Sequence, residues 1–485
     1  MSEPTWISVL PPLLAIVLAI WTRQVYLSLA GGVWLGWMIL SGWSPLAGLA
    51  AAIEAVVAVF GDPGDTKVLL FTLVIGALIA TVEASGGVRG FVRWLDDNEW
   101  VNSSRRAELL AWTLGCVIFI ESNITVLVAG SISRPLFDRF RTSREKLAYL
   151  IDSTSAPICI LIPLNAWGAY NLGILGGLGV EDPLGVFVRS IGYNFYAMAA
   201  VLLALATVVW GLDLGPMKRA QERTRRGELL WPDATPMIDE DILSPSVDEL
   251  KIPPRAINMV APIVTMVVMM PVALWITGRT ALGESLAEAD NTFAILAEGS
   301  GSTSVLWAVM AGLAMAWVLL LAQRAHSLDE LTKMGLRGAG GLVPLALILL
   351  LALALGDVAN ALGTGVYVAQ VTAGVLPPTI FLPLIFLVAA GIAFSTGTSW
   401  GTFAIMLPIA VPAAATLGLP LAPFVAASLS GGIFGDHCSP ISDTTIISSM
   451  AAATDHIDHV RTQLPYALLG GAAAAGAFAL AGATL

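Results

Sequence analysis

The sequence has very little charge for its length. Of its 485 residues, 12% are Asp, Glu, Lys or Arg, whereas 56% are hydrophobic. Soluble domains carry roughly 25% charged residues, so a soluble protein of this size would need polar surface that this chain does not supply. Apolar runs of about 20 residues, long enough to cross a hydrocarbon core about 30 Å thick, recur along it. The sequence therefore predicts an all-α polytopic protein of the lipid bilayer, with about ten to thirteen candidate spans.

Cysteine is scarce as well. The three residues Cys116, Cys159 and Cys438 lie in apolar segments without paired or CxxC spacing, so neither a disulfide framework nor a zinc site is indicated. The net charge of −11 argues against nucleic acid as a partner. No nucleophile–base pair or metal-binding motif stands out, and we therefore expect neither an enzyme nor a cofactor.

One polar segment, residues 213–255, interrupts the apolar sequence. It begins with basic residues at 218–226 and continues with acidic ones. We interpret it as a solvent-exposed connector between a first membrane half, residues 1–212, and a second, residues 256–485. Its basic start directly after a span favours the cytoplasm by the positive-inside rule.

Lys and Arg are absent from residues 338–454, and His437 is the only histidine there. Two of the three charged side chains in this region, Asp436 and Asp443, fall with His437 inside residues 435–445, GDHCSPISDTT. This stretch also contains four hydroxyl side chains and a proline that would interrupt a helix. Ionisable side chains are expensive in a lipid-embedded segment and typically mark functional sites.

The two halves share a weak pattern. Residues 121–125 begin an apolar run that ends at a proline, and residues 398–402 begin another. Residues 152–157, DSTSAP, resemble residues 436–440, DHCSP, if one position is gapped. Corresponding interruptions in two halves are typical of internal-repeat transporters whose site lies near the bilayer midplane.

The prolines suggest what the site binds. Proline has no N–H, so Pro440 should release the carbonyl of Asp436 and Pro157 that of Ser153. A released carbonyl beside carboxylates and hydroxyls forms an all-oxygen set, which suits a hard cation such as sodium. The lack of Lys and Arg also favours a cation, because a carboxylate substrate usually needs a cationic partner. Helix N-termini could still hold an anion.

Each of these residues also has a structural explanation. Asp436, Asp152 and Asp443 could be held by hydrogen bonds between packed helices, and Glu121 could be functional or structural. His437 could carry a proton or simply donate to a carbonyl. Residues 455–459, DHIDH, resemble a pair of metal ligands, but they lie at the end of a span. We expect a solvated turn there.

Residues 435–445 resemble the signature of the NhaC-type sodium/proton antiporters, and residues 121–123 (ESN) and 152–154 (DST) are also similar to that family. The resemblance in length and layout covers nearly the whole chain. It implies two inverted-topology repeats with broken helices and re-entrant hairpins, and scaffold and transport domains that move as an elevator. It also implies a homodimer in the bacterial inner membrane. Some members of the family exchange sodium for protons, whereas others resemble carriers of small carboxylates or amino acids.

We therefore expect a secondary transporter that exchanges Na⁺ for H⁺. The alternative is a Na⁺- or H⁺-coupled transporter of a small organic acid or amino acid. Asp436 and Asp152 are the candidates for alternating Na⁺ and H⁺ binding, because a carboxyl group in a low-dielectric site keeps its proton until a cation arrives. The candidate ion-binding residues are Asp436, Asp152, Asp443, His437, Ser122, Asn123, Ser153, Ser155, Ser399, Ser439 and Glu121.

Overall fold

The computed structural model of the chain describes residues 5–22, 24–87, 90, 101–119, 122–163, 165–236, 253, 255–283, 295, 299–372 and 377–485. Within these ranges the regular structure is helical, apart from one isolated β-bridge between Pro236 and Asp455. An apolar chain favours helices because each helix bonds its own backbone N–H and C=O groups, which lipid cannot do.

The first half contains η1 (Trp6–Val9), α1 (Leu10–Thr22), α2 (Val25–Leu40), α3 (Pro45–Ala58), η2 (Val59–Gly61), α4 (Pro63–Ala84), α6 (Ser104–Val117), α7 (Ser122–Arg139), α8 (Arg144–Cys159), α9 (Ala166–Gly177), α10 (Pro183–Ile191) and α11 (Phe195–Trp210). After α12 (Gly215–Arg225), the second half contains α14 (Ile257–Leu282), α16 (Gly301–Ala322), α17 (Leu328–Gly341), α18 (Val343–Ala361), α19 (Thr364–Thr372), α20 (Pro378–Thr396), α21 (Ser399–Thr416), α22 (Leu421–Cys438), α23 (Asp443–Ala452) and α24 (His456–Gly482).

Eight helices among the described residues are long and apolar enough to cross a membrane, or up to nine if α2 and α3, bent by 119°, form one span. This is fewer than the ten to thirteen runs expected, because several runs are divided into short helices. Residues 107–133, for example, fall on α6 and α7, and residues 147–180 on α8 and α9. The chain is a multi-pass membrane protein.

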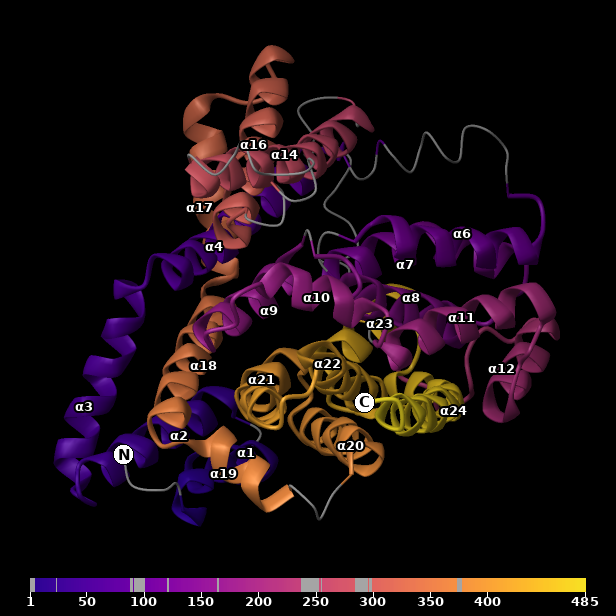
Figure 1. The fold of residues 1–485 in the computed structure, drawn as a ribbon. Helices are drawn as coiled ribbons and strands as arrows, with labels where there is room; N and C mark the ends of the chain where they lie inside the picture. Colours follow the sequence, from indigo (N-terminus) through magenta and orange to yellow (C-terminus); the bar gives the residue numbers. More distant parts are fainter. Residues whose placement is uncertain are drawn as a thin grey trace.

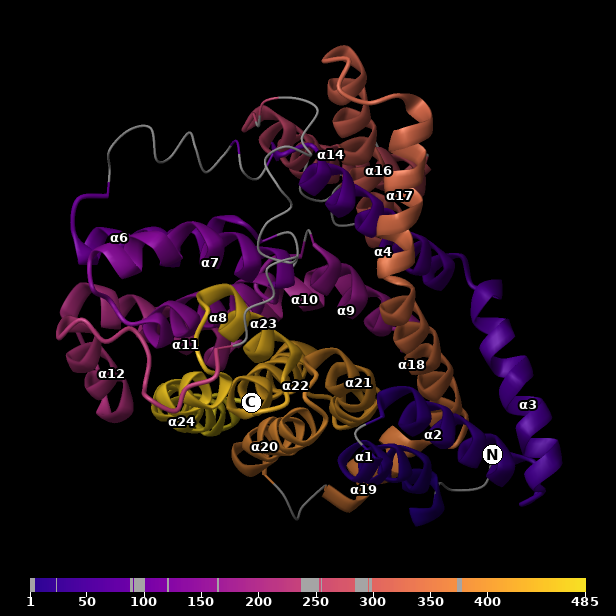
Figure 2. The ribbon, with the colours of Figure 1, turned by 180° about the vertical axis from the view of Figure 1, so that it is seen from behind.

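The helices form two groups, each built from both halves of the sequence (Figures 1 and 2). The first group contains α1 to α4 and α14 to α19. The second contains α6 to α12 and α20 to α24. In the second group, α7 and α8 pack against α23, so segments about 300 residues apart in the chain become neighbours.

Two pairs of helix breaks lie in the second group. The break between α6 and α7 is joined to the break between α8 and α9, because Asn165 Nδ2 donates to the carbonyls of Phe119 at 3.0 Å and Cys159 at 2.9 Å. The break between α20 and α21 is joined to the break between α22 and α23, because Ser439 Oγ donates to the carbonyl of Phe394 at 2.7 Å. The α20 break contains Gly397, whose φ of 69° is a left-handed conformation that glycine adopts readily.

The start of the polar segment is not an exposed linker. Arg223 on α12 is 4% exposed, and its guanidinium donates to both carboxylate oxygens of Glu145 on α8, at 2.7 and 3.0 Å. The connector thus begins with a helix that is exposed on one face only, because this buried ion pair attaches α12 to the beginning of α8. Residues 237–252 of the predicted connector lie outside the described residues.

Candidate functional site

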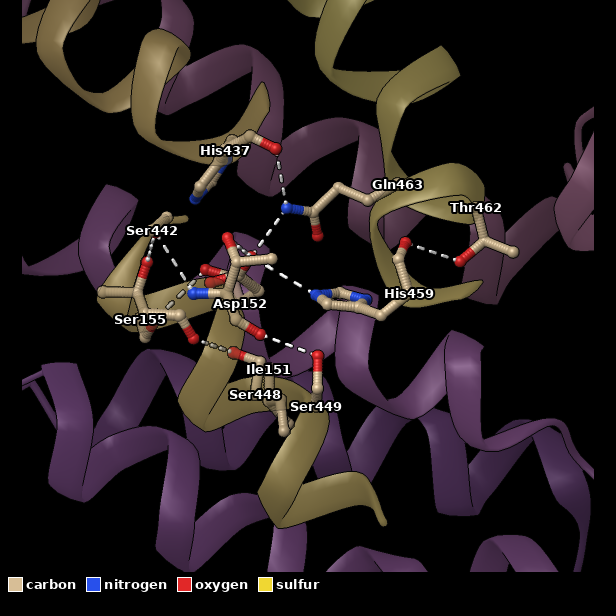
Figure 3. A network of polar contacts seen from close by, with 12 residues as sticks. Ile151, Asp152, Ser155, His437, Ser442, Ser448, Ser449, His459, Thr462 and Gln463 are labelled. Carbon is tan, nitrogen blue, oxygen red and sulfur yellow. Dashed lines mark hydrogen bonds and ion pairs between the residues drawn. The ribbon is translucent and has the colours of Figure 1, made fainter. Parts of the chain in front are cut away.

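Asp152 lies at the centre of the polar cluster in Figure 3. It is fully buried in the middle of α8. Its Oδ2 accepts hydrogen bonds from Gln463 Nε2 at 2.6 Å and from Thr445 Oγ1 at 3.3 Å. The ring of His459 also faces this oxygen, with Nε2 at 3.5 Å. One carboxylate thus connects α8 to α23 and α24.

Asp436 is connected to Asp152 through two adjacent residues of α23. It is 1% exposed, near the end of α22, and its Oδ2 accepts from Thr444 Oγ1 at 3.2 Å. Thr444 and Thr445 occupy the first turn of α23, which Ser442 caps by accepting from the Thr445 amide at 3.3 Å. Two adjacent threonines therefore link the two buried carboxylates, one hydroxyl to each.

His437 connects the cluster to α11. Its Nδ1 lies 3.1 Å from the hydroxyl of Tyr196, and its backbone carbonyl accepts from Gln463 Nε2 at 3.1 Å. Tyr196 and His437 are both buried. Gln463 consequently bridges the helices that carry Asp152 and Asp436.

Several buried atoms of this cluster have no hydrogen-bond partner among the residues that the structure describes. They are one oxygen of each carboxylate (Oδ1 of Asp152 and Oδ1 of Asp436), Gln463 Oε1 and His437 Nε2. Buried polar atoms are nearly always bonded in folded proteins, so such exceptions need an explanation such as a bound ion or water. Among the described residues, no Lys or Arg forms an ion pair with either aspartate. The cluster can accept protons or a small cation.

The predicted serines lie close to this cluster or at the breaks around it. Ser399 Oγ donates to the Gly432 carbonyl at 3.3 Å and neighbours Asp436. Ser155 Oγ donates to the Asp152 carbonyl at 3.0 Å, and Ser153 is buried beside it on α8. Ser439 belongs to the α22 break described above. Ser122, the first residue of α7, is also buried.

Three predicted residues remain: Asp443 lies beside Asp436 and acts on it electrostatically, whereas the side chains of Glu121 and Asn123 are not described. Asp443, the first residue of α23, is exposed, and its Oδ1 accepts from the amide of Thr444 at 2.8 Å. Glu121 lies outside the described residues. Asn123 belongs to α7, but its side chain is not among those described.

Two sequence expectations are wrong. The carbonyl of Asp436 is not released, because α22 ends at Cys438 and the Ser439 amide donates to this carbonyl at 3.0 Å. Residues 455–459 are not simply a solvated turn. Asp455 caps α24 as expected of a turn, but His459, one turn into the helix, is fully buried against Asp152.

His459 and Gln463 are the functional candidates that the sequence reasoning missed. They are four residues apart, which places them on one face of α24. Both residues precede the apolar run of residues 464–484, so the hydropathy of the sequence does not place them in a membrane helix. The i, i+4 spacing of two polar side chains beside an apolar run was the available signal.

A family model described as "Na+/H+ antiporter family" matches residues 179–483, which include Asp436, His437, His459 and Gln463. The chain belongs to the Na⁺/H⁺ antiporter family. This confirms the resemblance seen in residues 435–445, and the family consists of transporters rather than enzymes. A Haemophilus influenzae protein described as uncharacterized is 34% identical over 480 residues, which cover 96% of this antiporter-family chain and 88% of the relative.

Two shorter similarities are to proteins named as antiporters of organic acids and of amino acids. A Bacillus subtilis protein named malate-2H(+)/Na(+)-lactate antiporter is 38% identical over 87 residues, 18% of this chain and 19% of its own. An arginine/ornithine antiporter of Halobacterium salinarum is 35% identical over 107 residues, 22% of each chain. The crystal structure of the Alcanivorax borkumensis YdaH transporter has the same overall fold, with a TM-score of 0.60 at 13% identity over 96% of this chain and 98% of that one.

Proposed function

We propose that this antiporter-family chain exchanges Na⁺ for H⁺ at Asp436 and Asp152. The observation that carries the proposal is that each of these two buried carboxylates keeps one oxygen to which no described residue donates a hydrogen bond. Around Asp436 the neighbours are hydroxyl groups, Thr444 among them. Oxygen atoms alone suit a hard cation.

The exchange follows from the cost of buried charge. Two bare carboxylates joined by Thr444 and Thr445 would repel each other in a low-dielectric site, so one of them holds a proton or a cation. When Na⁺ arrives, the O–H bond of the carboxylic acid breaks, the proton leaves to water, and the carboxylate oxygen binds Na⁺. The charge of the site is unchanged, which favours exchange over the binding of both ions.

The fold supports alternating access at this site. The paired breaks of α6 to α9 and of α20 to α23 occupy corresponding places in the two halves, as inverted repeats require. We propose that residues 1–212 and 256–485 are these repeats, joined by a cytoplasmic connector at residues 213–255. In this proposal the first group of helices is the scaffold of a homodimer in the bacterial inner membrane, and the second group moves as an elevator.

Purified protein in proteoliposomes tests the assignment. An imposed Na⁺ gradient should drive proton movement through the wild type, and Asp436→Asn and Asp152→Asn should each abolish it. Asp329→Asn is a matched control, because Asp329 pairs with Lys333 on an exposed face of α17. Wild-type flux through Asp436→Asn would show that this carboxylate is not the exchange site.

A second candidate function is the coupled transport of a small organic acid or amino acid. His437 and His459 lie on two sides of Gln463, and a protonated imidazole would give the site the positive charge that a carboxylate substrate needs. The names of the malate/lactate and arginine/ornithine relatives agree with such a substrate class. Uptake of radiolabelled malate, lactate or arginine driven by an imposed Na⁺ gradient would favour this function, especially if His437→Gln and His459→Gln abolish the uptake.

A further inference from the structure

A cavity separate from the Asp152 and Asp436 cluster lies where the two groups of helices meet. Its volume is about 360 Å³, and its walls come from the start of α4, the end of α9, the α9–α10 connection and the start of α16. Figures 1 and 2 both show α4 beside α9 at the side of the molecule away from α12. Four carboxylate residues are among those lining it: Asp62, Asp65, Glu181 and Asp182.

Asp65 is the unusual member of this set. Its side chain lines the cavity although the residue is only 9% exposed. Its backbone amide donates to Oδ1 of Asp62 at 2.9 Å, which caps α4, but its own carboxylate has no hydrogen bond or ion pair with any residue that the structure describes. The carboxylate is thus partly buried and faces the cavity, and a partly buried carboxylate is more stable when a cation or a proton neutralises it.

The surroundings of Asp65 add negative potential. A Cβ atom placed on Gly177 would lie 3.4 and 3.7 Å from the two carboxylate oxygens, so Asp65 faces the last turn of α9. That end of a helix carries partial negative charge. Asp62 and Asp357 also act on Asp65 electrostatically. The cavity therefore attracts positive charge.

The nearby basic side chains are directed to other partners. Lys67 Nζ donates to Thr303 Oγ1 at 2.9 Å, and Arg189 pairs with Asp182 at 3.4 Å. Neither is bonded to Asp65. Since no Lys or Arg among the described residues pairs with Asp65, a cation or a proton from solution can occupy that position.

We propose that Asp65 binds a monovalent cation, represented by Na⁺, as a second cation site that nothing in the exchange mechanism requires. A divalent ion would need several converging acidic ligands, and the described part of the chain contains no group of three or more His, Cys, Asp or Glu side chains placed to hold a metal. The cavity has room for a partly hydrated ion, because one water occupies about 30 Å³ in the liquid. Carbonyls at the end of α9 would add neutral ligands.

The position of the site gives it a consequence beyond binding. Asp65 and Ser300–Ser302 belong to the first group of helices, whereas α9 and Glu181 belong to the second. A cation held between them stabilises the contact between the two groups. This effect does not depend on which substrate crosses at Asp152 and Asp436.

Equilibrium binding of radioactive ²²Na⁺ to the purified full-length chain tests the site. The background is the double variant Asp152→Asn/Asp436→Asn, which removes the proposed exchange site, and choline replaces Na⁺ at equal ionic strength as the blank. One saturable Na⁺ site should remain in this background. Adding Asp65→Asn should weaken it at least about tenfold, a loss of about 1.4 kcal/mol. Glu181→Gln, an exposed carboxylate of the same cavity, is the matched control and should change the affinity much less.

Two results would overturn the inference: no saturable Na⁺ binding in the double variant, or binding that survives Asp65→Asn unchanged. Should Asp65→Asn fail to fold, Asp65→Glu keeps the charge and displaces it by one methylene. An unchanged Na⁺ affinity and Na⁺/Li⁺ preference in that variant would also count against the site. If instead the wild type shows no Na⁺-driven proton flux while Asp65-dependent binding persists, the exchange proposal fails and this inference stands.

Discussion

Gln463 connects three helices of the site. From α24 its Nε2 donates to Asp152 on α8 and to the His437 carbonyl on α22. Both acceptors are oxygens, so the amide must present its NH₂ group to them when Asp152 is ionised. Its Oε1 then remains buried without a partner. The residue thus favours the ionised form of Asp152 and leaves an oxygen available to an ion.

Replacing this amide should therefore weaken cation binding. Without the hydrogen bond from Gln463, the ionised form of Asp152 is less stable, and Na⁺ displaces its proton less readily. The Na⁺ concentration for half-maximal flux should therefore rise about tenfold in Gln463→Leu. This change agrees with the cost of about 1–3 kcal/mol for an unsatisfied buried group. The control is Gln323→Leu, which removes an amide bonded to Asn258 at 2.6 Å, far from the site in sequence and fold. Equal effects of the two substitutions on this concentration would contradict the role.

At the scale of elements, the approach of α22 to α20 fixes where Asp436 lies. Gly431 and Gly435, one turn apart on α22, face the backbone of α20, and a Cβ on either would collide with a carbonyl, that of Phe386 or Ala390. Small residues allow membrane helices to pack this closely. Because Gly435 precedes Asp436, any displacement of α22 there moves the carboxylate.

Gly435→Ala should consequently impair both stability and transport. Overpacking of this kind costs about 1–3 kcal/mol, and the shifted Asp436 should reduce Na⁺-driven proton flux even in the fraction that folds. Gly476→Ala on α24 is the matched control, since nothing lies within 4 Å of a Cβ at that position. Thermal unfolding in detergent and flux in proteoliposomes measure the two effects. Wild-type values for both in Gly435→Ala would show that the close approach is unimportant.

At the scale of the whole molecule, the polar segment between the halves is attached to the helices that carry the site. Besides the Arg223–Glu145 pair, Lys146 on α8 pairs with Glu108 and Asp213, each at 3.0 Å. Thr235 donates to Asp455, the residue that caps α24. The described part of the connector is therefore attached to α8 and α24, the helices of Asp152 and Gln463.

Removing one member of the buried pair should be more damaging than removing both. Arg223→Met leaves Glu145 buried without a counter-charge, which destabilises a protein by about 3–5 kcal/mol, whereas a hydrophobic pair is often neutral. The double variant Arg223→Met/Glu145→Leu should recover most of the loss in thermal unfolding. Arg225→Met, an exposed neighbour on α12, should have little effect. A double variant less stable than Arg223→Met would contradict this account.

The sequence predicted the chemistry of the site, buried carboxylates among hydroxyl groups, better than it predicted which residues form the site. Asp152 and Asp436 were expected from their isolation in apolar segments, and the structure brings them to one pair of threonines. Asp443 was grouped with Asp436 because the two share one short motif. The turn between α22 and α23 puts them on different helices, where Asp436 is buried and Asp443 is more exposed, although the two still interact electrostatically. The motif alone did not reveal this difference in exposure.

The sequence by itself determined that this chain lies in a membrane. It also determined that the few carboxylates within its apolar segments are functional candidates, because hydrophobicity and charge are local properties of each segment. Only the tertiary structure decided which polar groups share a site. His459 and Gln463 reach Asp152 across about 300 residues of chain, and Asp65 meets the end of α9 across about 110. Such contacts depend on how helices pack and where they break, and no short stretch of sequence contains that information.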